Sequence, residues 1–197
     1  RTFLAGKWHL GTEDPTKHGF EEFYGTLVSA KTFWDPNHFI RLPKDRPQRE
    51  YEAEGFHGTD ALGDHALDFL TLARQTPKRP WFLYLAFNAP HFPLQAHPKD
   101  IHKYAGRYHG GWDKLRTERL ARMKKMKLVP TDISLPPRSP WWNYGETQTG
   151  QNPAWDTLSP DRRADLARRM AIYAAMVDQM DRNIGRVLAD LKRHKEF

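Results

Sequence analysis

The amino-acid sequence predicts an α/β domain with a mostly parallel central sheet, and three stretches carry that prediction. Residues 2–5, TFLA, form a short apolar run of the kind that ends a strand. Residues 59–76 place apolar side chains at helical spacing, and residues 81–87, WFLYLAF, are apolar or aromatic without alternation. Such an unbroken run is typical of a strand buried on both faces of a parallel sheet. A helix followed by such a strand indicates layers of helix and sheet.

Capping residues mark the ends of two long helices. Thr59 is the expected N-cap of the first helix, Asp60 suits its first turn, and Pro77 stops it. The last helix is expected to start with Ser159 as its N-cap and Pro160 at its first position. Its apolar stripe then recurs in steps of three and four, at Leu166, Met170, Tyr173, Val177, Met180, Ile184, Val187 and Leu191. The stripe indicates a helix lying across a sheet, with a coiled-coil seam as the alternative.

Three further stretches separate these elements. Residues 11–58 are rich in turn residues and are expected to form an ordered loop with a short helix. Residues 112–127 carry seven Lys and Arg side chains and are predicted to be a basic helix. Residues 128–158 form a long loop rich in Pro and Trp. A loop of that length inside a compact domain is usually functional or mobile.

Composition and charge limit the classes of function. The 197 residues are 39% hydrophobic and 13% aromatic, which indicates a folded chain. No apolar run approaches the roughly 20 residues that span a bilayer. The absence of cysteine excludes disulfides, thiolate metal ligands and a cysteine nucleophile within these residues. The net charge of +7 favours anionic partners such as nucleic acid, phosphate or sulfate esters, and polyanionic glycans.

Two histidine motifs follow the two predicted strands. Lys7 and His9 stand in the segment GKWHLG after the strand that ends near Ala5, and His91 follows the strand that ends near Phe87. In open α/β sheets ligands bind beyond the carboxyl ends of the strands, so both motifs are expected to face one crevice. Taken singly, each histidine is more often a hydrogen-bonded structural residue, and Lys7 a solvated turn residue. Their matching positions favour an anion-binding site.

Signatures of several other classes are absent from the sequence. The remaining histidines form no HExxH or HxH pattern, which argues against a zinc site. No GxxxxGK[ST], GxGxxG or GxSxG element is present, so the common nucleotide-binding and serine-hydrolase motifs are missing. The basic stretch 112–127 lacks a recognisable reader motif, and no nucleic-acid partner is expected. We interpret it as a solvated face, with binding of an anionic substrate chain as the second interpretation.

Three segments of the chain resemble the sulfatase family. The segment RTFLAGKWHLG resembles the second signature of that family, with its Gly-Lys-Trp-His-Leu-Gly core intact. Residues 82–93, FLYLAFNAPHFP, resemble the family's strand and APHxP element, and residues 174–181, AAMVDQMD, resemble the helix before its Asp-Asn metal segment. The segments follow the family's order and cover nearly the whole chain. Residues 1–197 are thereby identified as an internal part of an arylsulfatase-like catalytic domain of the alkaline phosphatase superfamily.

The resemblance implies an alkaline-phosphatase-like α/β/α sandwich that hydrolyses sulfate esters. In this family a Cys or Ser is oxidised to formylglycine, whose hydrate attacks sulfur while a divalent cation, usually Ca²⁺, holds the sulfate oxygens. Carried over to this sequence, Lys7 would contact the sulfate and the nucleophile, and His9 would hold the hydrate and take its proton. His91 would bind a sulfate oxygen near the leaving group. Preplaced cationic donors stabilise charge that builds on oxygens, and histidine suits general-base work.

Parts of the family pattern are missing from this chain. The motif Cys/Ser-x-Pro-x-Arg and the paired-aspartate metal segment are absent, and the Asp-Asn metal pair and a later lysine would lie beyond Phe197. We therefore expect the nucleophile and the metal ligands to lie outside the chain, the sheet to be incomplete, and the 197 residues alone to be inactive. The expected substrate is a sulfated small molecule or a sulfated glycan. The resemblance suggests an exported protein, either periplasmic, extracellular or lysosomal.

Two alternative functions stand beside the sulfatase. A phosphonate monoester or phosphodiester hydrolase of the same superfamily shares the scaffold and the nucleophile chemistry. A basic polyanion-binding module that uses residues 112–127 belongs to a different class. Its binding would depend on salt and would survive replacement of Lys7, His9 and His91.

Overall fold

The computed structural model describes residues 1–137 and 153–197. The chain divides into two compact units, residues 1–100 with 173–197 and residues 101–172, and each is described by itself. Trp141, Trp142 and Tyr144 of the predicted loop 128–158 lie outside the described residues.

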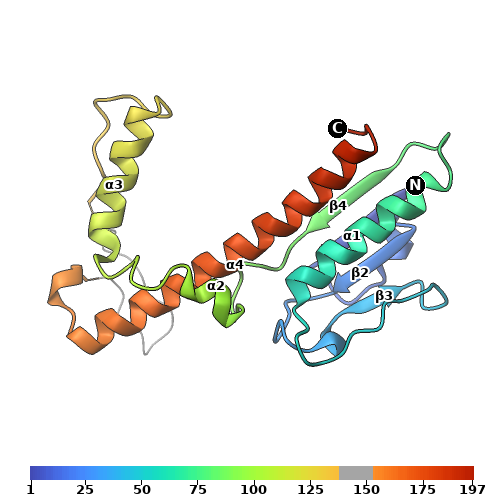
Figure 1. The fold of residues 1–197 in the computed structure, drawn as a ribbon, viewed down its shortest axis with the longest axis horizontal. Coiled ribbons are helices and arrows are strands. Elements are labelled where there is room, and N and C mark those ends of the chain that lie inside the picture. Colours follow the sequence, from blue (N-terminus) through green and yellow to red (C-terminus); the bar gives the residue numbers. More distant parts are fainter. Residues whose placement is uncertain (138–152) are drawn as a thin grey trace. The chain divides into compact units, whose positions relative to one another are not determined.

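In its described part, the first unit is built on a four-stranded sheet in the order β3-β2-β1-β4 (Figure 1). β1 (Thr2–Lys7) pairs in parallel with β2 (Glu22–Thr26) on one side and with β4 (Phe82–Ala86) on the other. β3 (Ile40–Leu42) pairs antiparallel with β2. The predicted α/β class with a mostly parallel sheet is therefore confirmed.

Helix α1 (Gly58–Arg74) packs on one face of the sheet and supplies much of the main core. Phe69 of this helix stacks on Phe3 of β1, with the ring centroids 5.4 Å apart. Each large apolar side chain buried in this way stabilises the fold by roughly 1.5–3 kcal/mol. The buried apolar side chains that α1 contributes are Ala61, Leu62, Ala66, Phe69, Leu70 and Ala73.

The N-cap of α1 is His57, and the prediction of Thr59 was wrong. Nδ1 of His57 accepts a hydrogen bond from the Thr59 amide at 3.2 Å, and its Nε2 lies 3.3 Å from the carbonyl oxygen of Gln95. A neutral imidazole has one acceptor nitrogen, so it can fill the role that Ser, Thr, Asn or Asp usually fills at an N-cap. The usual capping preferences do not point to histidine.

Two strands occur where the sequence predicted an ordered loop. Residues 11–58 contain β2 and β3 together with two short 3₁₀ helices, η1 (Pro15–His18) and η2 (Pro36–His38). The β2 sequence EFYGT starts with a charged residue and contains a glycine, so neither alternation nor an apolar run marks it. Its pairing with β1 makes it a strand, and that pairing is a tertiary contact.

β4 is not buried on both faces, in contrast to the prediction from its apolar run. Leu83 and Leu85 pack against the core under α1, whereas Phe82 and Tyr84 are 57% and 50% exposed. β4 is the outermost strand of the described sheet, and α1 lies against only one of its faces. The strand therefore alternates in burial although its sequence does not.

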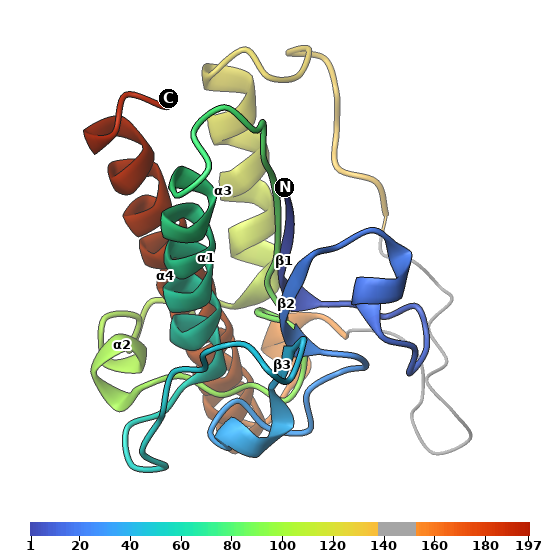
Figure 2. The same cartoon turned by 90° about the vertical axis from the view of Figure 1, so that its right-hand side faces the viewer.

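Helix α4 (Pro160–Arg193) starts where the sequence predicts it to start. Ser159 Oγ accepts a hydrogen bond from the Arg162 amide at 3.3 Å, in keeping with its predicted capping role. In the first unit, the carboxyl-terminal part of α4 runs beside α1 (Figure 2). The face buried there overlaps the predicted apolar stripe only in part: Val187 is buried and Leu191 packs against the core, whereas Tyr173 is 38% exposed. The buried residues are Ala175, Met176, Gln179, Asn183, Val187 and Asp190.

A polar contact joins α4 to α1. Asn183 Nδ2 and Gln179 Nε2 donate to the two carboxylate oxygens of Asp60 at 2.7 and 2.8 Å. Gly63 of α1 allows the close approach, since a Cβ at that position would lie 2.3 Å from Asn183 Oδ1. Hydrophobic periodicity cannot locate an interface of this kind, because its specific contacts are hydrogen bonds to a carboxylate.

The second unit contains the predicted basic helix, α3 (Gly111–Lys125). Trp155 in the short helix η3 (Trp155–Thr157) packs edge to face on Trp112 at 5.0 Å. The Trp155 amide donates to Asp113 Oδ2 at 2.9 Å. A short helix, α2 (Pro98–His102), precedes α3 along the chain. Among the helices of residues 1–137 and 153–197, none combines the length and apolarity needed to cross a bilayer.

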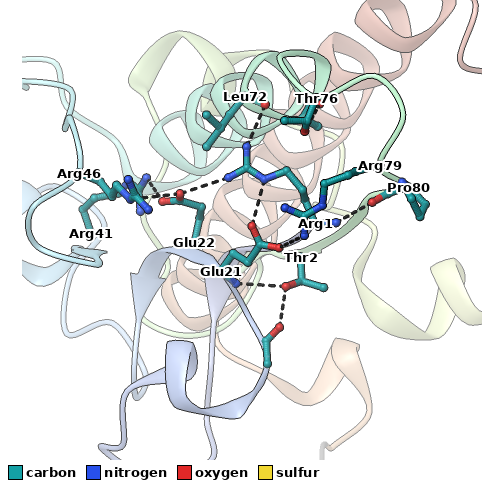
Figure 3. A network of polar contacts seen from close by, with 12 residues as sticks. Arg1, Thr2, Glu21, Glu22, Arg41, Arg46, Leu72, Thr76, Arg79 and Pro80 are labelled. Carbon is teal, nitrogen blue, oxygen red and sulfur yellow. Dashed lines mark hydrogen bonds and ion pairs between the residues drawn. The ribbon is translucent and has the colours of Figure 1, made fainter.

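At the amino end of β2, Glu22 is surrounded by arginines (Figure 3). Its side chain is 1% exposed and bonds to the Arg41 guanidinium, with the Arg46 and Arg1 guanidinium groups at 3.5 and 3.7 Å. Arg41 also donates to the carbonyl oxygen of Phe23 at 3.4 Å. A buried charge is tolerated only with such partners. The cluster therefore ties β3 and the start of β1 to β2.

Two buried histidines predict a loss of stability in mild acid. Burial lowers the pKa of His57 to about 4 and that of His65 to about 3, from an ordinary value of 6.5. Above pH 6.5 both histidines are neutral in the folded and the unfolded chain, and the fold has its full stability. As the pH falls toward the folded pKa values, the unfolded chain takes up these protons first, and the free energy of unfolding decreases. Between pH 6.5 and the folded pKa, each histidine should lower the free energy of unfolding by about 1.4 kcal/mol per pH unit. Urea unfolding at pH 7.5 and 5.5 should thus differ by about 2–3 kcal/mol.

A variant of His65 separates this effect from general acid sensitivity. His65 stacks on Tyr24 at 3.5 Å, and its Nε2 has no hydrogen-bond partner in the described residues. His65→Phe keeps a ring in that place and cannot take a proton. The difference between the two pH values should then be about half as large. If the free energy of unfolding changed equally between the two pH values in the variant and the wild type, His65 would not be a source of the acid sensitivity.

Candidate active site at the carboxyl ends of the strands

Two glycines bring the central strands close together where they end. Gly6 pairs with Gly25 across β1 and β2, at φ values of 142° and 155° that favour glycine. A Cβ on Gly25 would lie 1.8 Å from the carbonyl oxygen of Gly6, and a Cβ on Gly6 would lie 1.9 Å from that of Ala86. The next residue of β1 is Lys7, which pairs with Thr26. The glycines therefore set the backbone spacing directly before the first candidate residue.

Lys7 ends β1 with its side chain partly buried and oriented by a hydrogen bond. Its Nζ donates to Oγ of Ser29 at 2.9 Å, and Ser29 follows the end of β2. An ammonium group has three donors, so two remain for an anion.

His9 lies two residues further on, exposed and in the left-handed backbone region, with φ 57°. The amides of Trp8 and His9 donate to the carbonyl oxygens of Thr26 and Leu27 at 2.9 and 2.8 Å. The Trp8 ring packs against Phe20 in an edge-to-face arrangement at 6.1 Å. Backbone bonds and the packed indole hold the turn, while the imidazole of His9 stays accessible.

His91 follows β4, and its ring is oriented by its own loop. Nδ1 lies 2.6 Å from the carbonyl oxygen of Phe92, so Nδ1–H donates and this bond leaves Nε2 unused. The His91 amide donates to the carbonyl oxygen of Asn88 at 2.9 Å. Asn88 is buried, and its Nδ2 donates to Thr26 Oγ1 at 2.9 Å. The His91 ring is exposed.

The three candidate residues occupy neighbouring strand ends. β1 and β4 are parallel neighbours in which Gly6 pairs with Ala86, so the segments that carry Lys7 and His91 leave the same edge of the sheet. Sequence reasoning did not identify Thr26, Ser29 and Asn88, which bind these segments. Asn88 lies inside the motif FNAPH, whereas Thr26 and Ser29 lie in a stretch interpreted as loop.

Metal-ligating side chains do not gather in the described part of the chain. Residues 1–137 and 153–197 hold no group of three or more His, Asp and Glu side chains arranged for an ion. We therefore assign no metal ligand among them.

The fold and the strand-end residues define a class of protein, an α/β protein with a lysine and two histidines at the carboxyl ends of the parallel strands of a mixed sheet. The chain belongs to the sulfatase family, since the family model described as Sulfatase matches residues 1–197. It is 34% identical to an uncharacterized sulfatase of Schizosaccharomyces pombe, over 97% of this chain and 35% of that protein. It is 29% identical to an arylsulfatase of Klebsiella aerogenes, over 98% of this chain and 41% of that enzyme. The chain thus spans between a third and a half of these relatives.

Solved structures share the fold. The structure titled Ps i-CgsB in complex with k-i-k-neocarrahexaose matches all of this chain and 34% of its own, with a TM-score of 0.56 and 23% identity. The structure of BT4656 in complex with its substrate D-glucosamine-2-N,6-O-disulfate matches with a TM-score of 0.54 and 18% identity, over 44% of that chain. At these identities the likeness concerns the fold.

Proposed function

We propose that the full-length protein containing this chain hydrolyses sulfate esters and that a sulfated sugar is its substrate. The observation that carries this proposal is the placement of GKWHLG and His91 at adjacent strand ends in a sulfatase-family chain. Relatives include the arylsulfatase of Klebsiella aerogenes and the N-acetylgalactosamine-6-sulfatase of Homo sapiens. The structure title of BT4656, a fold neighbour, gives a sulfated glucosamine as its substrate. These support the sulfated-sugar class.

Each of the three candidate side chains would have a different role in the reaction, according to its position. The two free donors of Lys7 would bind sulfate oxygens and the nucleophile, with Ser29 keeping the ammonium group in place. The exposed imidazole of His9 would take the proton from the nucleophile's second hydroxyl. Nε2 of His91 is not used by the bond to Phe92, and in the imidazolium form, in which both ring nitrogens donate, it would bind a sulfate oxygen near the leaving group. Lys7 and His91 would then be in place to donate to the sulfate oxygens on which negative charge builds in the transition state.

The reaction also needs groups that we place outside this chain. By the family resemblance, a formylglycine would supply the attacking oxygen, and a divalent cation, usually Ca²⁺, would supply the charge that holds the sulfate. By the same resemblance we propose that the protein is exported.

Matched esters test the proposed function. The full-length protein should be assayed on 4-nitrophenyl sulfate, on a 4-nitrophenyl phosphonate monoester with the same leaving group, and on a sulfated glucosamine. We expect kcat/KM for the aryl sulfate to exceed that for the phosphonate by about tenfold or more, with sulfate released from the sugar. A preference for the phosphonate would favour the other hydrolase class of the superfamily.

The polyanion-binding alternative gains little from the structure. In α3, Lys114 pairs with Glu118 at 3.8 Å, and Arg116 donates to the carbonyl oxygen of Pro136 at 3.1 Å. The remaining basic residues fit the interpretation of a solvated face. Glycan binding that survives replacement of Lys7 and weakens with salt would revive this alternative.

A further inference from the structure

We propose that the end of β2 and the turn after it, residues 26–29, position all three candidate catalytic side chains; this rests on the proposed function. Each candidate segment makes a hydrogen bond to this short stretch, directly or through one residue. Residues 26–29 themselves need not touch the substrate. They would act as positioning residues for Lys7, His9 and His91.

The backbone of this stretch holds the turn that carries His9. The carbonyl oxygens of Thr26 and Leu27 accept from the amides of Trp8 and His9 at 2.9 and 2.8 Å. The two bonds hold the turn after β1 against the end of β2, beyond the last paired residues Lys7 and Thr26. They hold the backbone where His9 takes φ 57°, a conformation that few non-glycine residues adopt. The direction of the imidazole therefore depends on where β2 ends.

The hydroxyl of Ser29 holds the side chain of Lys7. It accepts from Lys7 Nζ at 2.9 Å, and both side chains are partly buried. A lysine side chain without a partner loses rotamer entropy when the substrate orders it. A serine already in place supplies part of that ordering before the substrate arrives.

The hydroxyl of Thr26 holds the segment of His91 through Asn88. Thr26 and Asn88 are 4% and 5% exposed, and Asn88 Nδ2 donates to Thr26 Oγ1 at 2.9 Å. The carbonyl oxygen of Asn88 in turn accepts from the His91 amide at 2.9 Å. The chain of bonds crosses from β2 to the loop after β4, although β1 lies between these strands. The side-chain bond therefore links the end of β2 to the loop after β4, beyond the end of β1, which lies between these two strands.

Variants of the Thr26–Asn88 pair test the proposal in the full-length protein. Thr26→Val removes the hydroxyl at nearly constant shape, Asn88→Ala removes the donor, and Thr26→Ser keeps the hydroxyl. We expect kcat to fall about 10- to 100-fold in the first two variants with a small change in KM, because small misplacements of reacting groups cost rates of this size. Thr26→Ser should retain most of the activity. The double variant should lose about as much as either single one, since both remove the same bond.

Hydrogen exchange supplies a readout that does not depend on catalysis. Peptides covering residues 88–95 should exchange about tenfold faster in Thr26→Val and Asn88→Ala, while peptides from α1 keep their rates. Asn183→Ala is the matched control, because it removes a second buried asparagine that bonds Asp60 on α1. It should lower overall stability without selective exchange at 88–95 and without a tenfold loss of kcat.

The outcomes separate this proposal from the function on which it rests. Unchanged exchange at residues 88–95 in Thr26→Val, or unchanged kcat together with faster exchange, would overturn the positioning role. If the variants showed the expected faster exchange at residues 88–95 but the wild-type protein cleaved no sulfate ester, the sulfatase proposal would be overturned instead. Ser29→Ala extends the test to Lys7: we expect kcat/KM to fall about fivefold to tenfold, and Ser29→Thr to restore it.

Discussion

Replacing His9 by asparagine in the full-length enzyme is expected to lower kcat for sulfate esters by about 10²- to 10⁴-fold, the usual size of a general acid–base contribution. Asparagine is chosen because His9 lies at φ 57°, and asparagine tolerates this region better than alanine does. The backbone bonds from Trp8 and His9 should therefore remain. Steady-state kinetics measure the loss, and circular dichroism checks that the fold is retained.

A second histidine provides the control for this experiment. His102 is exposed at the end of α2 and takes no part in the proposed site. His102→Asn makes the same chemical change and should leave kcat at the wild-type value. If His9→Asn and His102→Asn were equally active, the proton-accepting role of His9 would be wrong.

Replacing Glu22 by alanine is expected to lower the free energy of unfolding by about 3–5 kcal/mol, the cost of removing one partner of a buried ion pair. Glu22 is 1% exposed, and Arg41 beside it has a side chain that is 6% exposed. Without the carboxylate, the Arg41 guanidinium would remain buried with carbonyl oxygens as acceptors. Urea denaturation at pH 7.5 measures the change.

The neighbouring glutamate is the matched control. Glu21 has a side chain that is 36% exposed and pairs with Arg1 and Arg79 at 3.0 and 3.1 Å. Glu21 is itself partly exposed, and without it Arg1 keeps the carbonyl oxygen of Leu72 and Glu22 as partners. Glu21→Ala should therefore have a small effect, about 0–1 kcal/mol as for surface pairs. Combining Glu22→Leu with Arg41→Met should recover much of the loss, because it removes both buried charges together. A small effect of Glu22→Ala itself would show that the cluster adds little to stability.

The parts of the fold that were predicted correctly are those with strong local signals. α1, α3 and α4 have regular helical spacing or charge, and the runs at β1 and β4 are apolar. The parts that were missed depend on neighbours. β2 becomes a strand because β1 pairs with it, and β4 alternates in burial because α1 lies against only one of its faces. α4 buries a partly polar face because Asp60 of α1 provides the acceptors.

The candidate site shows the same division. Lys7, His9 and His91 could be selected from the sequence because they stand in motifs at the ends of apolar runs. Thr26 and Ser29 could not, because a single hydroxyl in a turn-rich stretch has no distinguishing pattern. Their importance follows from the order of the strands, which places the end of β2 next to the end of β1.

By itself, the sequence determined the fold class, the boundaries of the main helices to within a few residues, and the side chains suited to an anion. These depend on properties that each residue carries locally, such as spacing, capping and charge. Only the tertiary structure decided which strands are neighbours, which helix faces are buried and which hydroxyl holds which candidate residue. Those features depend on contacts between residues far apart in the chain, as between Thr26 and Asn88, and no local pattern encodes them.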